Sequence, residues 1–206
     1  MFETLSRLVN PIHRSWLTYG HFVTDALAPP VCVLCGGSGR DGRACHPPGP
    51  WGLDLCTWCE QACRHVPLAC PRCGQPRASE QETECADCRA RPPPFQATWC
   101  LFAYGDPADR LVTALKFEGR LACARVLGML MAEQLRARAR PLPDCVIPLP
   151  SHASRHRERG FCHTSEIARH LLRRLGARAT RPPVRTDLLR RIRATRVQSG
   201  LSAGER

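Results

Sequence analysis

The chain has 206 residues, 14 cysteines and a formal net charge of +12. This length accommodates one small metal-stabilised module and one domain of ordinary size. The sequence excludes a membrane span, because no apolar run approaches the roughly 18 residues that a spanning helix requires.

The first 30 residues predict an amphipathic helical segment. Glu3, His13 and Asp25 interrupt its apolar residues, and it lacks the apolar core and small-residue cleavage site of an export signal. Disulfides form in oxidising compartments, which only an exported chain would reach. The sequence therefore favours a cytoplasmic protein whose cysteines are reduced and bind metal.

Four C-x-x-C pairs follow one another along residues 31–91. Two thiolates separated by two residues form one knuckle of a zinc site, and a second knuckle completes a tetrahedral shell. Twenty residues separate the first two pairs and eleven the last two, which favours sequential pairing. The sequence predicts a double zinc ribbon with two structural Zn²⁺ ions, one bound by Cys32, Cys35, Cys56 and Cys59 and one by Cys70, Cys73, Cys85 and Cys88.

Two alternatives to this ligand set are open. The pairs could instead form a disulfide framework, or a neighbouring cysteine could replace a ligand: Cys63 in place of Cys59, or Cys45 together with His46. Most cysteines outside the pairs are expected to be small buried hydrophobic residues, in particular Cys100, Cys123 and Cys145.

The proline run at 92–94 marks a linker between the zinc ribbon and a second domain over residues 95–206. Aromatic and β-favouring residues over 95–104 predict a strand. Asp106 and Pro107 predict a helix start, as N-cap and first helical residue, and Gly119 marks the end of that helix. Apolar spacing over 121–138 predicts a second helix with one face toward the core.

A second predicted strand, over 145–150, enters a basic loop over 151–160. A predicted helix from Phe161 to about Leu175 follows this loop. In α/β proteins that bind anions, such a loop lies at the carboxyl end of a strand and before a helix N-terminus, which attracts negative charge. The loop arginines are therefore candidates for phosphate binding, together with Gly160, which allows a tight backbone turn.

Positive charge is concentrated at the end of the chain. Residues 151–206 contain fourteen arginines and four acidic residues, a net charge of +10. Arg190, Arg193 and Arg196 lie three residues apart and could line an arm that closes over a phosphorylated ligand, and Thr195 and Gln198 could add neutral hydrogen bonds. The alternative is that these arginines only form solvated faces.

Several of these motifs match one family pattern. They are the cysteine knuckles, Tyr104, LKFEGR at 115–120, IPLP at 147–150, R-x-RERGF at 155–161 and the stretch from Leu189 to Arg206. On these residues the chain resembles the ComF family, known from bacterial competence for DNA uptake, over nearly its whole length from Cys32 onward. It departs from the family at Cys162 and His163, where Asn-Gln is usual.

The resemblance implies an α/β fold. In it, the double zinc ribbon precedes a phosphoribosyltransferase-like domain, a parallel sheet with flanking helices that binds phosphoribosyl pyrophosphate and Mg²⁺. It implies pyrophosphate binding by the loop, with Arg155, Arg157, Arg159 and Gly160, and a flexible hood with Arg190, Arg193, Thr195 and Gln198. The family signature of two aspartates and then Thr-Thr-Gly does not occur before Arg206. We therefore expect an incomplete sheet, no transferase activity, and phosphoribosyl pyrophosphate binding only in a longer form.

Three functions follow as hypotheses. The favoured one is a ComF-like competence protein that binds single-stranded DNA, or another phosphate-bearing ligand, through its arginine-rich region and works with the DNA-uptake machinery. The second is a phosphoribosyltransferase that uses Mg²⁺. The third treats the zinc ribbons only as folding staples and partner docks. Binding along a phosphate track should weaken steeply with salt, whereas phosphoribosyl pyrophosphate binding should need Mg²⁺.

Overall fold

The computed structural model describes most of the chain, namely residues 31–37, 48–49, 53–63, 68–77, 79–138, 141–176 and 182–195. The chain divides into two compact units, Met1–Gln61 and Ala62–Arg206. The predicted amphipathic segment over 1–30, the hood residues Arg196 and Gln198, and Cys45 lie outside the described residues.

The first unit contains a short antiparallel ribbon. Strand β1 (Pro48–Gly49) pairs with β2 (Leu53–Cys56), and helix α2 (Thr57–Ala62) follows directly. Leu53 and Leu55 are buried, since alternate side chains of a strand point to the same face. The backbone N–H of Val33 donates to the carbonyl of Asp54, at 2.8 Å, and joins the first cysteine knuckle to β2.

The second unit begins with an irregular segment that carries α3 (Ala86–Ala90). The strand predicted over 95–104 is not formed. This stretch instead lies beside the Cys70–Cys73 knuckle, where the N–H of Thr98 donates to the carbonyl of Pro71 at 3.1 Å. A strand needs a neighbour for its backbone hydrogen bonds, and aromatic composition alone does not supply one.

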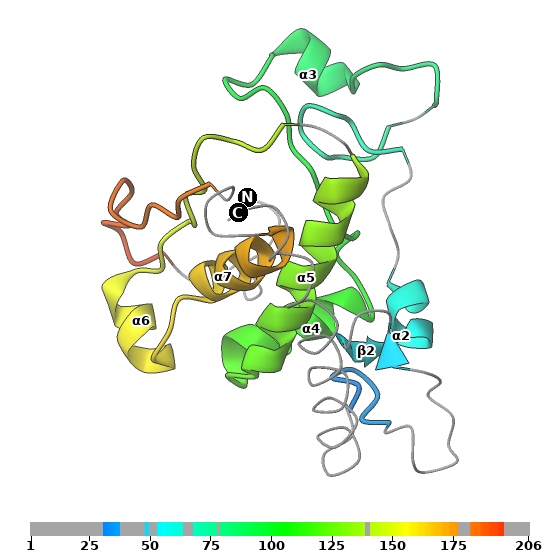
Figure 1. Ribbon diagram of the computed structural model, residues 1–206. Helices are drawn as coiled ribbons and strands as arrows, with labels where there is room; N and C mark the ends of the chain where they lie inside the picture. Colours follow the sequence, from blue (N-terminus) through cyan, green and yellow to red (C-terminus); the bar gives the residue numbers. More distant parts are fainter. Residues whose placement is uncertain are drawn as a thin grey trace, which may run out of the picture. The chain divides into compact units, whose positions relative to one another are not determined.

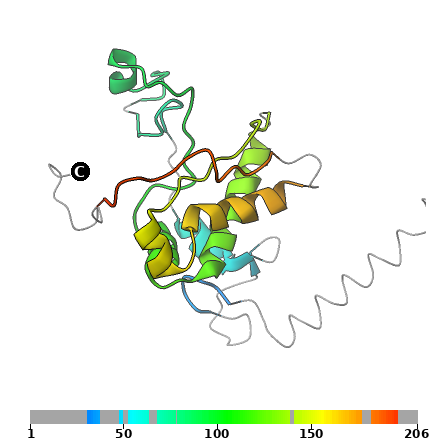
Figure 2. The same ribbon diagram turned by 90° about the vertical axis from the view of Figure 1, so that its left-hand side faces the viewer.

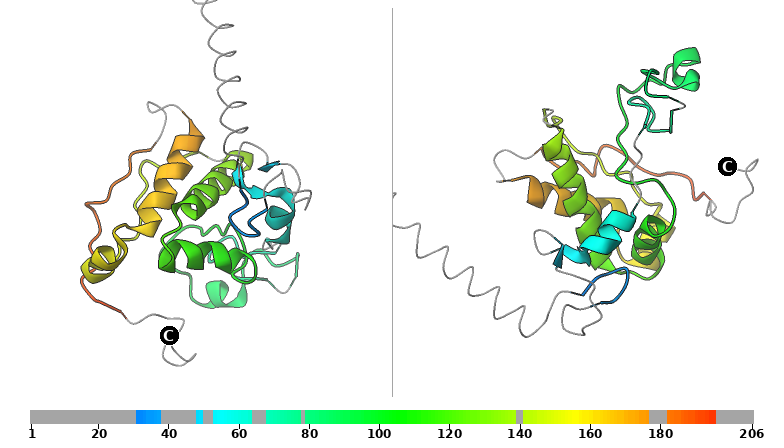
Figure 3. Two further views of the ribbon diagram at one scale, coloured as in Figure 1. Left: turned by 90° about the horizontal axis from the view of Figure 1, so that it is seen from below. Right: turned by 90° about the vertical axis from the view of Figure 1, so that its right-hand side faces the viewer.

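Three helices form the apolar core of the second unit: α4 (Ala108–Phe117), α5 (Leu121–Ala137) and α7 (His163–Leu175). Helix α5 packs against both α4 and α7, as Figures 1 and 3 show. The predictions of these helices are confirmed, although the N-cap of α4 is Pro107 and not Asp106. None of the described helices has the length and apolar composition needed to cross a lipid bilayer.

The basic segment over 151–160 is not a loop. Residues Ala153–Arg159 form helix α6, in which Ala, Arg and Glu all favour helix. The side chain of His152 caps its start by accepting from the N–H of Ser154, and Gly160 ends it with a φ of 77°. A left-handed glycine is a common helix terminator. The sequence therefore predicts the turn at Gly160, but not the helix before it.

The expected parallel sheet is not present in the part of the chain that the structure describes. Between 141–152 and 182–195 there is a single parallel bridge, from Val146 to Val184. The N–H of Val146 donates to the carbonyl of Pro183, and the N–H of Arg185 donates to that of Val146, each at 2.9 Å. Figure 2 shows the two segments side by side. This parallel pairing is the one trace of the predicted sheet among these residues.

Gly128 is where α5 and α7 approach most closely. A Cβ at this position would lie 2.6 Å from the carbonyl oxygen of Ile167 and 2.8 Å from the backbone nitrogen of Leu171. Real Cβ atoms do not approach backbone so closely, so any side chain here must push the helices apart. We predict that Gly128→Ala lowers the free energy of unfolding by about 1–3 kcal/mol through overpacking, measured by urea titration.

The matched control is Gly105→Ala. A Cβ on Gly105 meets no atom within 4 Å, so this variant should unfold close to the wild-type midpoint. Equal stability of the Gly105 and Gly128 variants would contradict the close helix contact.

Candidate metal centres and basic cavity

Two groups of four cysteines gather their sulfur atoms. In each group all four Sγ atoms lie within 4.8 Å of one another. The groups are Cys32, Cys35, Cys56 and Cys59 in the first unit, and Cys70, Cys73, Cys85 and Cys88 in the second. The predicted sequential pairing of the knuckles is confirmed.

The first knuckle of each group is a turn closed by a glycine. Gly36 and Gly74 have φ angles of 71° and 78°, which other residues rarely adopt. The N–H of Gly36 donates to the carbonyl of Cys32 at 2.9 Å, and that of Gly74 to Cys70 at 2.8 Å. The two turns are therefore built in the same way.

The second knuckle of each group lies at the start of a helix. Cys56 ends β2 directly before α2, and Cys85 is the N-cap of α3. The N–H of Cys59 donates to the Sγ of Cys56 at 3.5 Å, and the N–H of Cys85 to the Sγ of Cys70 at 3.4 Å. Backbone donors aimed at sulfur stabilise a thiolate, which is the form that binds metal.

The sulfur spacing fits zinc. A Zn–S bond of about 2.3 Å in a tetrahedron places neighbouring sulfurs about 3.8 Å apart. The Sγ atoms of Cys35 and Cys56 are 3.9 Å apart, and those of Cys73 and Cys85 are 3.6 Å apart. These eight cysteines could thus hold two structural Zn²⁺ ions, whose role would be to join distant turns of the chain.

The competing ligand sets receive no support among the described residues. None of the described cysteines forms a disulfide. Cys63 is buried, but its sulfur does not belong to the first group, where Cys59 is the fourth member.

The pKa values of the thiols indicate how protons would be linked to zinc binding. Burial, as the largest influence, raises the pKa values of Cys32, Cys59 and Cys88. The N–H of Cys85 instead lowers the pKa of Cys70 to about 6. Four adjacent thiolates repel one another, so zinc binding must displace protons from the remaining thiols.

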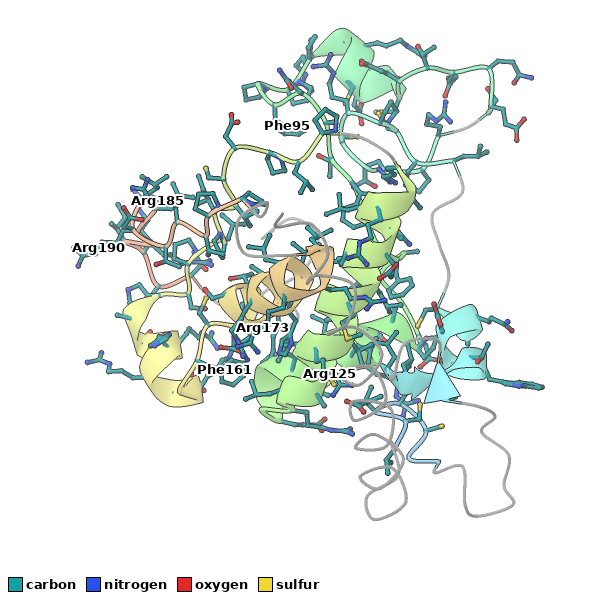
Figure 4. All side chains as sticks on the ribbon, viewed as in Figure 1. Phe95, Arg125, Phe161, Arg173, Arg185 and Arg190 are labelled. Carbon is teal, nitrogen blue, oxygen red and sulfur yellow. The ribbon has the colours of Figure 1, made fainter. Side chains whose placement is uncertain are left out.

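A basic cavity of about 340 Å³ lies elsewhere in the second unit. It is lined by the C-terminal end of α4 and by the turn between α6 and α7, with Lys116, Phe117, Gly119, Glu158, Arg159 and Phe161. Phe161 lies at the junction of α6 and α7 in Figure 4. The guanidinium of Arg159 lies over the ring of Phe117, 5.4 Å from its centroid. This stacking holds the cation at the cavity wall.

The structure separates the three predicted loop arginines. Arg159 lines the cavity, Arg155 pairs with Glu158 at 4.0 Å, and Arg157 is exposed on α6. Since α6 is a helix, Arg155 and Arg159 share a face while Arg157 points elsewhere. The three arginines therefore do not act as one cluster.

His163, the first residue of α7, lies within reach of several positive charges. Burial, followed by the charges of Lys116, Arg159 and Arg191, lowers its pKa to about 4. Its Nδ1 atom is buried without a hydrogen-bond partner. Burial and Arg159 also lower the pKa of Lys116. Charges of one sign thus converge on this part of the molecule.

The predicted hood residues are exposed along 182–195. Arg190, Arg193 and Thr195 all face solvent, and Figure 4 shows Arg185 and Arg190 on this segment. Arg191, which the sequence did not single out, donates to the hydroxyl of Thr195 at 2.5 Å. Arg185 instead forms a two-pronged ion pair with Asp187, with contacts of 2.9 and 2.6 Å, and lowers the pKa of that carboxyl to about 2.

Cys162 lies beside the hydroxyls of Ser151 and Thr164, with its Sγ at 3.6 and 3.2 Å. Burial raises its pKa, but hydrogen bonds from Ser165, Thr164 and Ser151 outweigh burial and lower the pKa to about 6. Thr164 also donates to the carbonyl of Leu149 at 2.6 Å. Hydroxyl groups thus connect the start of α7 to the 145–151 segment. They surround Cys162, which with His163 replaces the Asn-Gln pair that is usual in the family the sequence resembles.

Sequence reasoning missed four site residues, two that line the cavity and two from the group of titratable side chains around His163. They are Lys116, Phe117, His163 and Arg191. The LKFEGR motif was a signal for the first two, but no local pattern relates it to residues 159–163. Helix packing, which the sequence does not encode locally, brings these segments together.

Comparison with known proteins identifies relatives among bacteria. The DNA utilization protein YhgH of Escherichia coli is 34% identical over 179 residues, which cover 85% of this chain and 72% of that protein. Its namesake in Salmonella typhi is 32% identical over 157 residues, covering 74% of this chain and 66% of the relative. The chain belongs to the ComF family. This confirms the resemblance drawn from the motifs, and the two cysteine groups of this ComF-family chain fit a double zinc ribbon.

A third relative is more distant. Competence protein F of Haemophilus influenzae is 25% identical to this ComF-family chain over 156 residues, covering 74% of this chain and 65% of that protein. The matches therefore span 65% to 72% of the length of these three relatives. No family model and no solved structure matches the chain.

We predict that the purified chain binds two zinc ions, and that Cys73→Ser reduces this number to one. Losing one of four thiolates leaves an incomplete shell, which should release its ion and unfold the region around α3. Native mass spectrometry measures the stoichiometry. Cys145→Ser, outside both groups, is the control and should retain two ions; loss of zinc from this control would contradict the ligand assignment.

We predict that His163 makes stability depend on pH. Its pKa is about 4 in the folded chain and about 6.5 in the unfolded chain, so the unfolded state binds more protons between these values. The free energy of unfolding should therefore be highest above about pH 6.5 and fall toward pH 4.

The measurement is urea unfolding at about pH 7.5 and about pH 5 for the wild type and His163→Gln. The variant should lose less stability on acidification than the wild type. His156→Gln, exposed on α6, is the control and should behave as the wild type. An equal loss in all three proteins would contradict the neutral, partly buried imidazole of His163.

Proposed function

We propose that this chain serves DNA utilization by binding single-stranded DNA through phosphate contacts of its arginine-rich region. The relatives support this role, since they carry the names DNA utilization protein and competence protein. The observation that carries the proposal is the gathering of unpaired positive charge around α6 and the 182–195 segment.

The charge is available to a ligand. Among the described residues, no ion pair joins Arg157, Arg190 or Arg193 to a carboxylate, and all three side chains are exposed. Arginine remains charged at any physiological pH and donates to phosphate in a planar fork. A flexible strand of phosphates can contact such scattered donors, because its backbone repeats the same anion along its length.

Aromatic residues supply few stacking platforms. Trp99 is half-buried: its Nε1–H donates to Gln134 at 2.9 Å, and Arg138 lies over its ring at 5.1 Å. Phe117 is 58% exposed and lies in the basic cavity. Affinity should therefore come mainly from phosphate contacts and show little sequence preference.

Phosphoribosyl pyrophosphate with Mg²⁺ is the second ligand to test. It too carries phosphate, and family membership favours it. The sequence contains no pair of aspartates followed by Thr-Thr-Gly, so the residues that would hold its ribose and 5′-phosphate are not found in this chain. We therefore rank DNA above it, with a component of the DNA-uptake machinery as the expected protein partner.

We predict that binding of a fluorescent oligothymidylate weakens steeply between about 50 and about 300 mM salt, without any need for Mg²⁺. Arg190→Gln and Arg193→Gln should each weaken binding and reduce the slope of log affinity against log salt by about 0.7. Fluorescence anisotropy measures both quantities.

Arg110→Gln, on α4 and outside the arginine-rich region, is the matched control for net charge. It should leave the slope nearly unchanged. Affinity that does not respond to salt, or that requires Mg²⁺ and phosphoribosyl pyrophosphate, would contradict the DNA proposal.

A further inference from the structure

The basic cavity has a distinct chemistry within the arginine-rich region. Lys116 at the end of α4 and Arg159 at the end of α6 both line it. Among the described residues neither forms an ion pair, and the one carboxylate that lines the cavity, Glu158, has its own partner in Arg155. Two cations therefore face a shared space without a compensating charge.

This arrangement is unfavourable while the cavity holds only water. Lys116 is partly buried, so its charge is less well solvated than on the surface, and the nearby Arg159 adds repulsion. The buried Nδ1 of His163 lacks a hydrogen-bond partner in the same neighbourhood. A bound anion would offset the repulsion between the cations and could supply the missing hydrogen bond.

The cavity also has aromatic walls. Phe117 and Phe161 line it, and Arg159 covers one face of the Phe117 ring. Phe117 remains 58% exposed, which leaves area for contact with a flat ligand. Base–aromatic stacking is the common way in which proteins hold unpaired bases. A volume of about 340 Å³ lies at the lower end of small-molecule sites and suits one nucleotide.

We propose that this cavity binds a single phosphorylated nucleoside, with Lys116 and Arg159 on the phosphate, His163 as a hydrogen-bonding partner and Phe117 or Phe161 against the base. The inference rests on the proposed function in expecting a phosphate-bearing ligand, and it adds where one nucleotide is held and by which residues. The nucleotide could be free or part of a single strand, which share this chemistry.

Isothermal titration with four probes tests the site: thymidine 5′-monophosphate, thymidine, inorganic phosphate and a short oligothymidylate. The wild type should bind the monophosphate or the oligothymidylate more tightly than thymidine or phosphate alone. Lys116→Met and Arg159→Gln should each weaken that binding about tenfold or more, as expected for a lost charge-assisted hydrogen bond. His163→Gln should weaken it less.

Arg110→Gln is the control variant and should bind as the wild type. Thermal melts check that each variant is folded; if Lys116→Met does not fold, Arg159→Gln decides. Binding of the monophosphate indicates a free nucleotide, and binding of the oligothymidylate alone indicates a nucleotide within a strand.

Three results would overturn the inference. They are unchanged affinity in both cavity variants, phosphate bound as tightly as the tighter-binding nucleotide probe, or thymidine bound as tightly as that probe. If the cavity variants retain salt-dependent binding of the oligothymidylate, the cavity proposal fails while the proposed function stands. If the wild type binds neither nucleotide probe, both fail.

Discussion

The region from 68 to 94 gathers four cysteine sulfurs that could hold a metal ion, and coordination by these thiolates would be the interaction on which its order depends. The buried residues that the structure describes there are Cys70, Gly74 and Cys88, so no apolar side chain other than cysteine forms a core. Structural zinc binding is worth about 10–16 kcal/mol in small zinc modules, which is enough to order a segment of this kind. The same plan of glycine turn and helix start recurs in the first unit, where Leu53 and Leu55 add a small apolar contribution.

The second unit holds its helices by ordinary packing. Leu111 and Leu115 of α4, Val126 of α5 and Leu172 of α7 are buried, and Glu133 of α5 accepts from Arg174 of α7 at 2.6 Å. This framework fixes the end of α4 and the start of α7, and Arg159, at the end of α6, lines the same cavity as Lys116 at the end of α4. The repulsion between the cations of the basic cavity is therefore a consequence of helix packing. A bound phosphate-bearing ligand would offset this repulsion.

Local signals predicted the parts of the fold that local chemistry determines. The eight ligands follow from C-x-x-C spacing, and α4, α5 and α7 follow from apolar periodicity with Gly119 as a stop signal. The strands predicted over 95–104 and 145–150 cannot be decided from local sequence alone. A strand forms only where a neighbouring strand pairs with its backbone hydrogen-bonding groups. Val146 has one bridge, to Val184, and the 95–104 segment is held instead by Trp99 and Thr98.

The site was predicted in part for the same reason. Arg159 was singled out from its motif, and it lines the cavity. Lys116 and His163 were not, because their proximity depends on how three helices pack. The sequence predicts a basic loop over 151–160 in which Arg155, Arg157 and Arg159 act together. Residues 153–159 instead form helix α6, whose composition favours helix, and the helix separates these arginines.

X-ray absorption at the zinc edge tests the account of the scaffold most directly, because it reports the ligand atoms themselves. The two cysteine groups predict an average shell of four sulfur atoms at about 2.3 Å around each ion. A shell that contains nitrogen or oxygen in place of sulfur would contradict the eight-cysteine assignment, and with it the physical basis proposed here for the order of the 68–94 region.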